Sequence, residues 1–345
     1  MNQHQSGSSR QIWLGIIFSL ICLAAIFYFI RPQEIIEALK TARYGYLLLS
    51  AGGIILFMFL RAIRWRYMLN NDAPIKTVFH IQNIGYLISA ILPLRLGDVA
   101  RSVLIGSVPP ITISRGISTM VVERVLDMLF IVTLLPFTVA SVDYLPQWMR
   151  AGALVSGIAA IAAILILIIA ANQRSLVERV VTWVLDYVPF MNTAAWVART
   201  DNFLAGLDSL TRLKDGTILL LLSIVIWIPI IFAYYTTLLA ANIEATPMMT
   251  AFIVCAAALS VALPSSPGQI GVFHVGVITA LQVWDQPEAA SASFAFLYHA
   301  LNSTILITLG IIGIFSTGST FRQVVDSTRA FLNRKEKGSN EPVSN

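Results

Sequence analysis

The chain has 345 residues, of which 57% are apolar and 12% carry a charge, about half the charged share of an ordinary soluble domain. With a mean hydropathy of +0.77, it is neither a soluble globule nor a disordered, collagen-like or disulfide-built chain, because those classes need polar, glycine-periodic or cysteine-rich sequences. The net charge is +5, but basic residues stand at the ends of apolar runs, which favours a role in membrane topology over nucleic-acid binding.

Six apolar runs are near the length of about 20 residues that a helix needs to cross a bilayer. They cover residues 12–30, 46–60, 117–140, 151–171, 217–241 and 291–316. The first exceeds a signal-peptide core and is followed by no small-residue cleavage site, so we expect it to be retained. The sequence predicts an all-α, polytopic membrane bundle of about six spans, forming one domain over residues 1–316 with halves at about 12–140 and 151–316.

Two further pairs of short apolar runs are interrupted by proline and glycine. They cover residues 78–92 with 99–106, and residues 248–263 with 270–283. The breaks read LPLRLGD and LPSSPGQIG. Irregular backbone at membrane depth is tolerated only where protein or a wet cavity satisfies it. The sequence therefore predicts two re-entrant or broken hairpins.

The distribution of Lys and Arg predicts the orientation of the spans. With the amino terminus in the cytoplasm and both breaks as hairpins, 19 basic residues lie inside and 4 outside, which favours cytoplasmic termini in a bacterial-type inner membrane. Residues 172–216 show two amphipathic patterns divided by Pro189, which predict a cytoplasmic helical hairpin or, alternatively, a pair of helices on the membrane surface. The polar, basic tail, residues 317–345, is expected to be disordered.

The two halves resemble each other. Aligning the breaks places Pro93 on Pro264 and Gly97 on Gly268, an offset of 171 residues. Further on, ERVLD, which starts at Glu123, falls on YHALN at an offset of 175. Because each half has an odd number of crossings, the second would enter the membrane from the opposite face. This pattern predicts an inverted repeat of the kind found in many transporters.

Polar residues at membrane depth are costly and become the candidate functional residues. Glu123, Arg124 and Asp127 lie about 9 to 15 Å into their predicted span. The two carboxylates share one helix face, and Arg124 is spaced to pair with Asp127. One interpretation is an ion-paired contact tying this span to Arg95 or Arg101. The other is a substrate site, and the two are compatible.

The breaks supply the remaining candidates. Arg95, Asp98 and Arg101 bracket the start of a short helix, where free N–H groups and guanidinium groups suit an anionic headgroup; ordinary positive charge at a hairpin mouth is the alternative. The second half contributes a polar group that either binds substrate or packs through hydrogen bonds. It consists of Gln269, His274, Tyr298, His299 and Asn302.

Other patterns carry less chemistry. The segment RAIRWR, residues 61–66, is typical of an anchor at the membrane interface. Cys22 and Cys255 lie far apart in apolar stretches and form no metal or redox pattern. The sequence contains no P-loop, zinc-protease motif or serine nucleophile elbow. We therefore expect no cofactor, no metal and no enzymatic activity.

At LPLRLGDVARSVLIG, SRGISTMVVERVLDMLFIV and ALPSSPGQIGVFH the sequence resembles the lysylphosphatidylglycerol synthase transmembrane region family, also described as flippase-like, over about residues 12–316. The resemblance implies a polytopic bundle with re-entrant segments that translocates a lipid. In two-domain relatives that lipid is an aminoacylated phosphatidylglycerol and an aminoacyltransferase domain follows, which we do not expect here. Other members are linked to hopanoid transport or fused to glycosyltransferases. Asp98 stands where the family more often has Glu, and His274 where many members have Glu.

The sequence thus favours a translocator that moves an anionic or lipid-linked molecule between leaflets. Its expected partner is a membrane lipid, and we expect no binding of nucleic acid. Arg95, Arg101 and Arg124 would receive the phosphate. The rival hypotheses are a membrane transferase acting on a lipid and an accessory subunit of a separate lipid-modifying enzyme.

Overall fold

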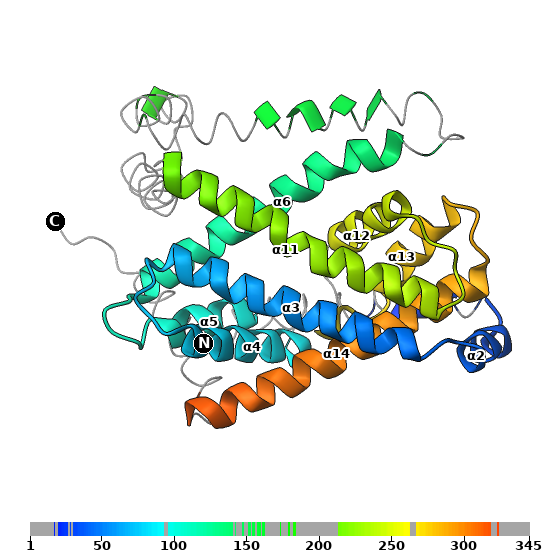
Figure 1. The fold of residues 1–345 in the computed structure, drawn as a ribbon, viewed down its shortest axis with the longest axis horizontal. Helices are drawn as coiled ribbons and strands as arrows, with labels where there is room; N and C mark the ends of the chain where they lie inside the picture. The colour runs from blue at the N-terminus through cyan, green and yellow to red at the C-terminus, as the bar shows by residue number, and fades with distance from the viewer. Residues whose placement is uncertain are drawn as a thin grey trace, which may run out of the picture.

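The computed structural model describes residues 30–92, 96–140, 213–262 and 267–318, together with scattered residues between 17 and 28, between 142 and 183, and at 323. The described part of the chain is helical and contains no strand (Figure 1). The predicted span at 12–30 is described only in part, and the predicted span at 151–171, the segment 172–216 and the tail lie largely outside the described residues.

The helices follow the predicted order. The described elements are α2 (Pro32–Lys40), α3 (Gly45–Met68), α4 (Ile75–Ile91), α5 (Leu96–Ile105), α6 (Ile113–Ala140), α11 (Leu213–Ala240), α12 (Pro247–Ala262), the 3₁₀ turn η1 (Pro267–Gln269), α13 (Val272–Gln282) and α14 (Glu288–Thr317). Among them α3, α11 and α14 are long and apolar enough to cross a membrane. The helix α6 has 28 residues but carries three charged residues near its middle. The all-α, polytopic membrane architecture is confirmed.

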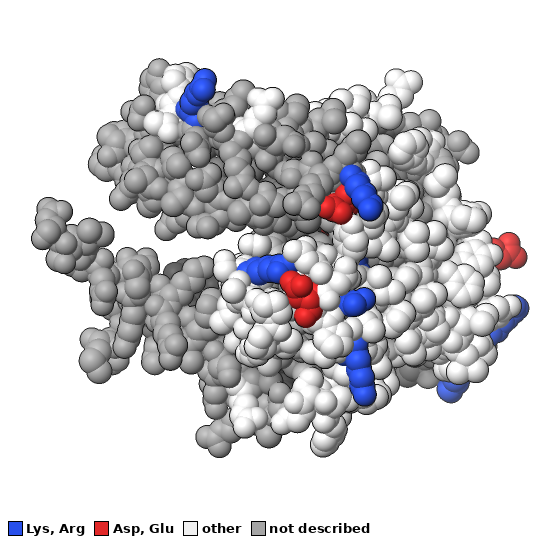
Figure 2. Space-filling model, turned by 60° about the vertical axis from the view of Figure 1, so that its left-hand side comes forward, with Lys and Arg blue, Asp and Glu red and all other residues white. Residues whose placement is uncertain are grey.

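The surface agrees with a membrane environment. Figure 2 shows that, on the face drawn, most of the described surface is uncharged and Lys, Arg, Asp and Glu side chains are few. Large apolar side chains are exposed on the long helices, among them Leu48, Phe137, Ile228 and Phe315. Such exposure is costly in water and favourable in lipid.

The helix α3 differs from its prediction. It continues to Met68, eight residues beyond the predicted end at residue 60, because the basic segment that follows does not face the solvent. Arg64 and Trp65 are fully buried and Arg61 is nearly so. The predicted interface anchor at residues 61–66 is therefore wrong for these three side chains, which pack inside the bundle.

Two pairs of short helices form at the predicted breaks. The helices α4 and α5 have 17 and 10 residues, and α12 and α13 have 16 and 11. At 1.5 Å per residue, each is shorter than the roughly 30 Å of hydrocarbon in a bilayer. Each pair packs helix against helix, so both predicted broken hairpins are present.

The packing of the helices follows the predicted repeat. In each half a long helix precedes a hairpin and a second long helix follows it, so that α3, α4, α5 and α6 correspond to α11, α12, α13 and α14. The first helix of each hairpin packs on the last long helix of the other half: α4 packs on α14, and α12 packs on α6. The first long helices of the two halves, α3 and α11, pack on each other (Figure 1).

Contacts along α3 and α11 show that these equivalent helices run in opposite directions. Near the start of α3, Ser50 donates to or accepts from Thr237 at 2.8 Å, late in α11. Near the end of α3, Tyr67 donates to Asp215 at 2.6 Å, early in α11. Equivalent helices with opposite directions are what an inverted repeat requires.

The first hairpin depends on a close approach between α4 and α5. A Cβ added to Gly97 would lie well inside contact distance of the Gly85 carbonyl oxygen and the Ser89 hydroxyl. Because backbone supplies one of these contacts, a larger residue cannot be accommodated by a change of rotamer.

We predict that Gly97→Ala destabilises the purified protein by about 1 to 3 kcal/mol, the usual cost of overpacking. The control is Gly52→Ala in α3, where an added Cβ meets nothing within 4 Å. Thermal unfolding in detergent, followed by size-exclusion fluorescence, measures both. Equal unfolding temperatures for the two variants would contradict the close contact.

Candidate functional site

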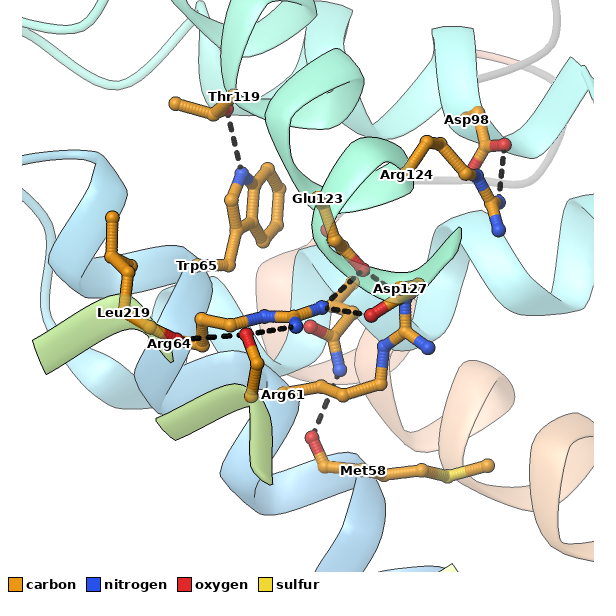
Figure 3. A network of polar contacts seen from close by, with 12 residues as sticks. Met58, Arg61, Arg64, Trp65, Asp98, Thr119, Glu123, Arg124, Asp127 and Leu219 are labelled. Atoms are coloured by element: carbon orange, nitrogen blue, oxygen red, sulfur yellow. Dashed lines mark hydrogen bonds and ion pairs between the residues drawn. The ribbon is translucent and has the colours of Figure 1, made fainter. Parts of the chain in front are cut away.

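A network of buried ion pairs joins α3, α5 and α6. Asp127 accepts hydrogen bonds from Arg61 at 2.9 Å and from Arg64 at 2.7 Å. Glu123 accepts from Arg101 at 2.8 Å. It also accepts from Arg61 (Figure 3). Arg64 is fully buried, and Arg101 and Glu123 are each 1% exposed. The charges are therefore satisfied by one another and not by water.

Neighbouring side chains hold the network in place. Arg64 also donates to Ser223 of α11 at 3.0 Å. The guanidinium of Arg101 lies 5.0 Å from the centre of the Trp65 ring, a cation–π distance. Trp65 in turn donates to Thr119 at 3.0 Å. Four helices are thereby tied together at the level of Glu123.

The predicted pair between Arg124 and Asp127 is wrong within the described residues. Arg124 instead donates to Asp98 of α5 at 2.6 Å (Figure 3). The reason is the direction of each side chain: Arg124 follows Glu123 by one residue and so points about 100° away around the helix. Glu123 and Asp127 face α3, whereas Arg124 faces the first hairpin. The sequence analysis proposed that this span forms an ion pair with Arg95 or Arg101. The ion pair with Arg101 forms through Glu123, and Arg95 lies outside the described residues.

Beside the network lies a cavity of about 200 Å³. It is lined by parts of both hairpins, of α6 and of α14. The lining residues are Tyr86, Ser89, Ala90, Asp98, Arg124, Val261, Gly268, Gln269, Phe273, Tyr298, His299, Asn302, Ser303 and Leu306. We call it the central cavity. It brings together six of the residues predicted from the sequence: Asp98, Arg124, Gln269, Tyr298, His299 and Asn302.

Equivalent positions of the two halves line the same central cavity. With the offset of 171 residues, Asp98 corresponds to Gln269 and Ala90 to Val261; with the offset of 175, Arg124 corresponds to His299. All six line the cavity. The cavity therefore lies where the two repeats meet, which is the usual place of a substrate site in repeat-built transporters.

The other candidates lie behind the cavity wall. Arg101, Glu123 and Asp127 belong to the buried network and do not line the cavity. His274 is 2% exposed, and its Nδ1 accepts a hydrogen bond from the backbone N–H of Gly271 at 3.3 Å. Its ring lies 4.8 Å from that of His299. His274 thus supports the start of α13 and the placement of His299.

The sequence analysis missed Arg61, Arg64 and Tyr86. Arg61 and Arg64 are three residues apart and so share a helix face, which could have indicated a buried partner. Within the described residues no group of three or more His, Cys, Asp and Glu side chains could hold a metal ion.

The charges of the site do not balance. Within the described residues the network and the cavity wall contain four guanidinium groups and three carboxylates, so one positive charge is in excess. Arg101 Nη1 is buried and has no hydrogen-bond partner among the described residues, and the same holds for the Tyr86 hydroxyl. An uncompensated buried cation is costly, and the site is therefore electrostatically suited to an anion.

We predict that Glu123→Gln lowers the free energy of unfolding by about 3 to 5 kcal/mol, because it removes the nearest buried carboxylate of Arg101 and leaves Arg61 with Asp127 alone. The control is Asp72→Asn, which removes the partner of Arg115 in a pair that is about 30% exposed and should cost at most about 1 kcal/mol. Folded yield and unfolding temperature in detergent measure both variants. Equal stability of the two would mean that the Glu123 carboxylate reaches water.

Comparison with curated proteins gives two relatives. The chain is 24% identical to glycosyltransferase AglD of Haloferax volcanii, over 94% of the chain but 57% of that longer protein. It is 22% identical to a UPF0104 membrane protein of Methanothermobacter thermautotrophicus, over 88% of the chain and 95% of the relative. No solved structure gives a significant match.

The first relative corrects one expectation. The sequence analysis expected no enzymatic activity, but a protein that aligns with 94% of the chain is named a glycosyltransferase. A transferase reaction therefore stands among the candidate functions.

The family assignment is more direct. The model of the lysylphosphatidylglycerol synthase TM region matches residues 12–310, which include both hairpins, the buried network and the central cavity. This is the extent over which the sequence resembles that family. The chain is a membrane protein of the lysylphosphatidylglycerol synthase TM region family.

Proposed function

We propose that the chain moves an anionic or lipid-linked molecule between the leaflets of the membrane, and that the central cavity receives its headgroup. The observation that carries this proposal is the place of the cavity: equivalent positions of two inverted halves line it, among them Arg124 from the first half and His299 from the second. A cavity shared by two such halves suits a substrate that is exposed first to one face and then to the other.

The pair of Arg124 and Asp98 supplies a way to bind the headgroup. The Arg124 side chain is 39% exposed and that of Asp98 is 13% exposed, so Arg124 is open to the cavity. An incoming phosphate would replace Asp98 as the partner of Arg124, since guanidinium groups bind phosphate through paired hydrogen bonds. Asp98 would keep Arg101 as a neighbour, 3.7 Å away.

The rest of the lining suits the same ligand. One monovalent anion would offset the excess positive charge of the site. Gln269, His299 and Asn302 offer hydrogen bonds from the second half, which would satisfy the remaining phosphate oxygens or the hydroxyl groups of a sugar or glycerol. The lipid itself would be supplied or consumed by a separate lipid-modifying enzyme.

We predict that the purified chain in liposomes makes fluorescently labelled phosphatidylglycerol accessible to a quencher added outside. Arg124→Gln should slow this exchange about tenfold or more, because one charge-assisted contact to the phosphate is lost. The matched control is Arg115→Gln, on the same helix but outside the cavity lining and paired with Asp72. Exchange no faster than in empty liposomes would contradict the proposal, as would equal rates for the two variants.

A membrane transferase is the second candidate, favoured by the name of the relative AglD. That protein is longer, and the chain covers 57% of it. The two candidates separate chemically, since a translocator changes the position of a lipid and a transferase changes its structure. Incubating the purified chain with an activated sugar and a lipid phosphate, followed by mass spectrometry, decides between them. A new glycolipid without leaflet exchange would establish the transferase.

The proposed orientation has cytoplasmic termini in an inner membrane, supported by the distribution of Lys and Arg. We predict that single cysteines placed at Asn71 and at Lys214 react only with a membrane-permeant thiol reagent in intact cells. A cysteine at Gln286 should react with an impermeant reagent as well. All three are made in a Cys22→Ser, Cys255→Ser background. Labelling of Lys214Cys by the impermeant reagent would reverse the second half and contradict the inverted repeat.

A further inference from the structure

A second cavity, of about 470 Å³, lies at the other end of the contact between α4 and α14. It is formed where α4 begins and where α5 and α14 end. The lining residues are Lys76, Thr77, His80, Ile81, Ile84, Leu104, Ser107, Val108, Ser316 and Thr317. We call it the end cavity. It shares no lining residue with the central cavity.

A closed helix contact separates the two cavities. Gly310 and Gly313 bring α14 directly against α4: a Cβ added to Gly310 would lie 2.9 Å from the Asn83 carbonyl oxygen, and one added to Gly313 would lie 2.8 Å from that of His80. Along α4, Lys76 and Ser89 are 13 residues apart, about 20 Å at 1.5 Å per residue. A ligand in the end cavity would therefore occupy a distinct site.

The polar side of the end cavity is basic. Lys76 and His80 are four residues apart on α4 and so lie on one face of the helix. The lining includes four hydroxyl groups and no Asp or Glu. The Nδ1 atom of His80 is buried without a hydrogen-bond partner among the described residues. The helix α4 also begins here without a side-chain cap at Pro74, which leaves first-turn N–H groups to attract an anion.

Much of the remaining lining of the end cavity is apolar. Ile81, Ile84, Leu104 and Val108 form this wall. A free anion would gain nothing from it, whereas a lipid would bury part of a chain there, at about 25 cal/mol for each Å² of apolar surface removed from water. Together with the basic side, this wall fits a molecule with a phosphate at one end and hydrocarbon at the other.

We propose that the end cavity binds the headgroup of an anionic phospholipid, with the phosphate at Lys76 and His80 and the chain against the apolar wall. This site is separate from the central cavity, and its occupancy does not depend on movement of lipid between leaflets. Its ligand chemistry, a phosphate ester, is shared with free phosphate, and the experiment distinguishes these two sources.

The test is native mass spectrometry of the full-length protein titrated with dioleoyl phosphatidic acid. We expect Lys76→Glu to weaken binding about tenfold or more, as loss of a charge-assisted contact does, and Lys76→Arg to retain it. Because Lys76 is exposed, neither change should unfold the protein. Lys214→Glu is the matched control, an exposed lysine at the start of α11 outside both cavities. Arg124→Gln should leave the Lys76-dependent binding within twofold.

Two results would overturn the proposal. Equal lipid affinities of Lys76→Glu and Lys214→Glu would show that the end cavity is not the lipid site. Displacement of the lipid by equimolar inorganic phosphate would show that the cavity binds a free anion. The outcome is independent of the proposed translocation. If the liposome assay shows no leaflet exchange while Lys76-dependent lipid binding persists, the translocator proposal is contradicted and the lipid site in the end cavity is retained.

Discussion

The burial of charge within an apolar bundle is the constraint on which the described structure depends. A guanidinium or carboxylate group placed alone at this depth would be costly, so each must find an opposite charge on another helix. Arg61, Arg64 and Arg101 meet Glu123 and Asp127 from three helices. Most of these groups have more than one partner, so removing one weakens contacts on several helices at once. The ion pairs thus fix the rotation and depth of α3, α5 and α6 more strictly than apolar contacts in lipid can, because lipid chains compete with apolar side chains for the same surfaces.

This constraint also positions the central cavity. Once Glu123 and Asp127 are turned toward α3, Arg124, which points about 100° away from Glu123 around the helix, must face the first hairpin and the cavity beside it. There it meets Asp98 with part of its side chain still exposed. The carboxylates of the buried network and the proposed binding group, Arg124, therefore lie on two different faces of one helix, α6. Under the proposed function, the structural interpretation of these charges applies to Glu123 and Asp127 and the substrate-site interpretation applies to Arg124.

The sequence predicted features that depend on local chemistry. The apolar runs predicted the long helices α3, α6, α11 and α14, and the prolines and glycines predicted the two hairpins. Both predictions succeed because hydropathy and chain breaks depend on residues that are close together in the sequence. The repeat alignment placed Arg124 opposite His299, and both line one cavity. The partners of Arg61 and Arg64 were not predictable in the same way, since pairing depends on how distant helices are rotated. Their sequence context, next to Trp65, is equally typical of a membrane interface, which led to the wrong assignment.

The two halves share their backbone plan but not their charges. Asp98 and Arg124 in the first half correspond to Gln269 and His299 in the second, and Glu123 and Asp127 correspond to Tyr298 and Asn302. Movement of α5 away from α6 would separate Arg101 from Glu123 and Arg124 from Asp98. Among the described residues, movement of α13 away from α14 separates groups that form no ion pair, such as His274 and His299. Separating buried ion pairs costs more than separating neutral groups. The second hairpin is therefore the easier one to displace, and an anion that replaces Asp98 at Arg124 would lower the cost of moving the first. In this way a bound headgroup would reduce the difference between the energetic costs of displacing the two hairpins.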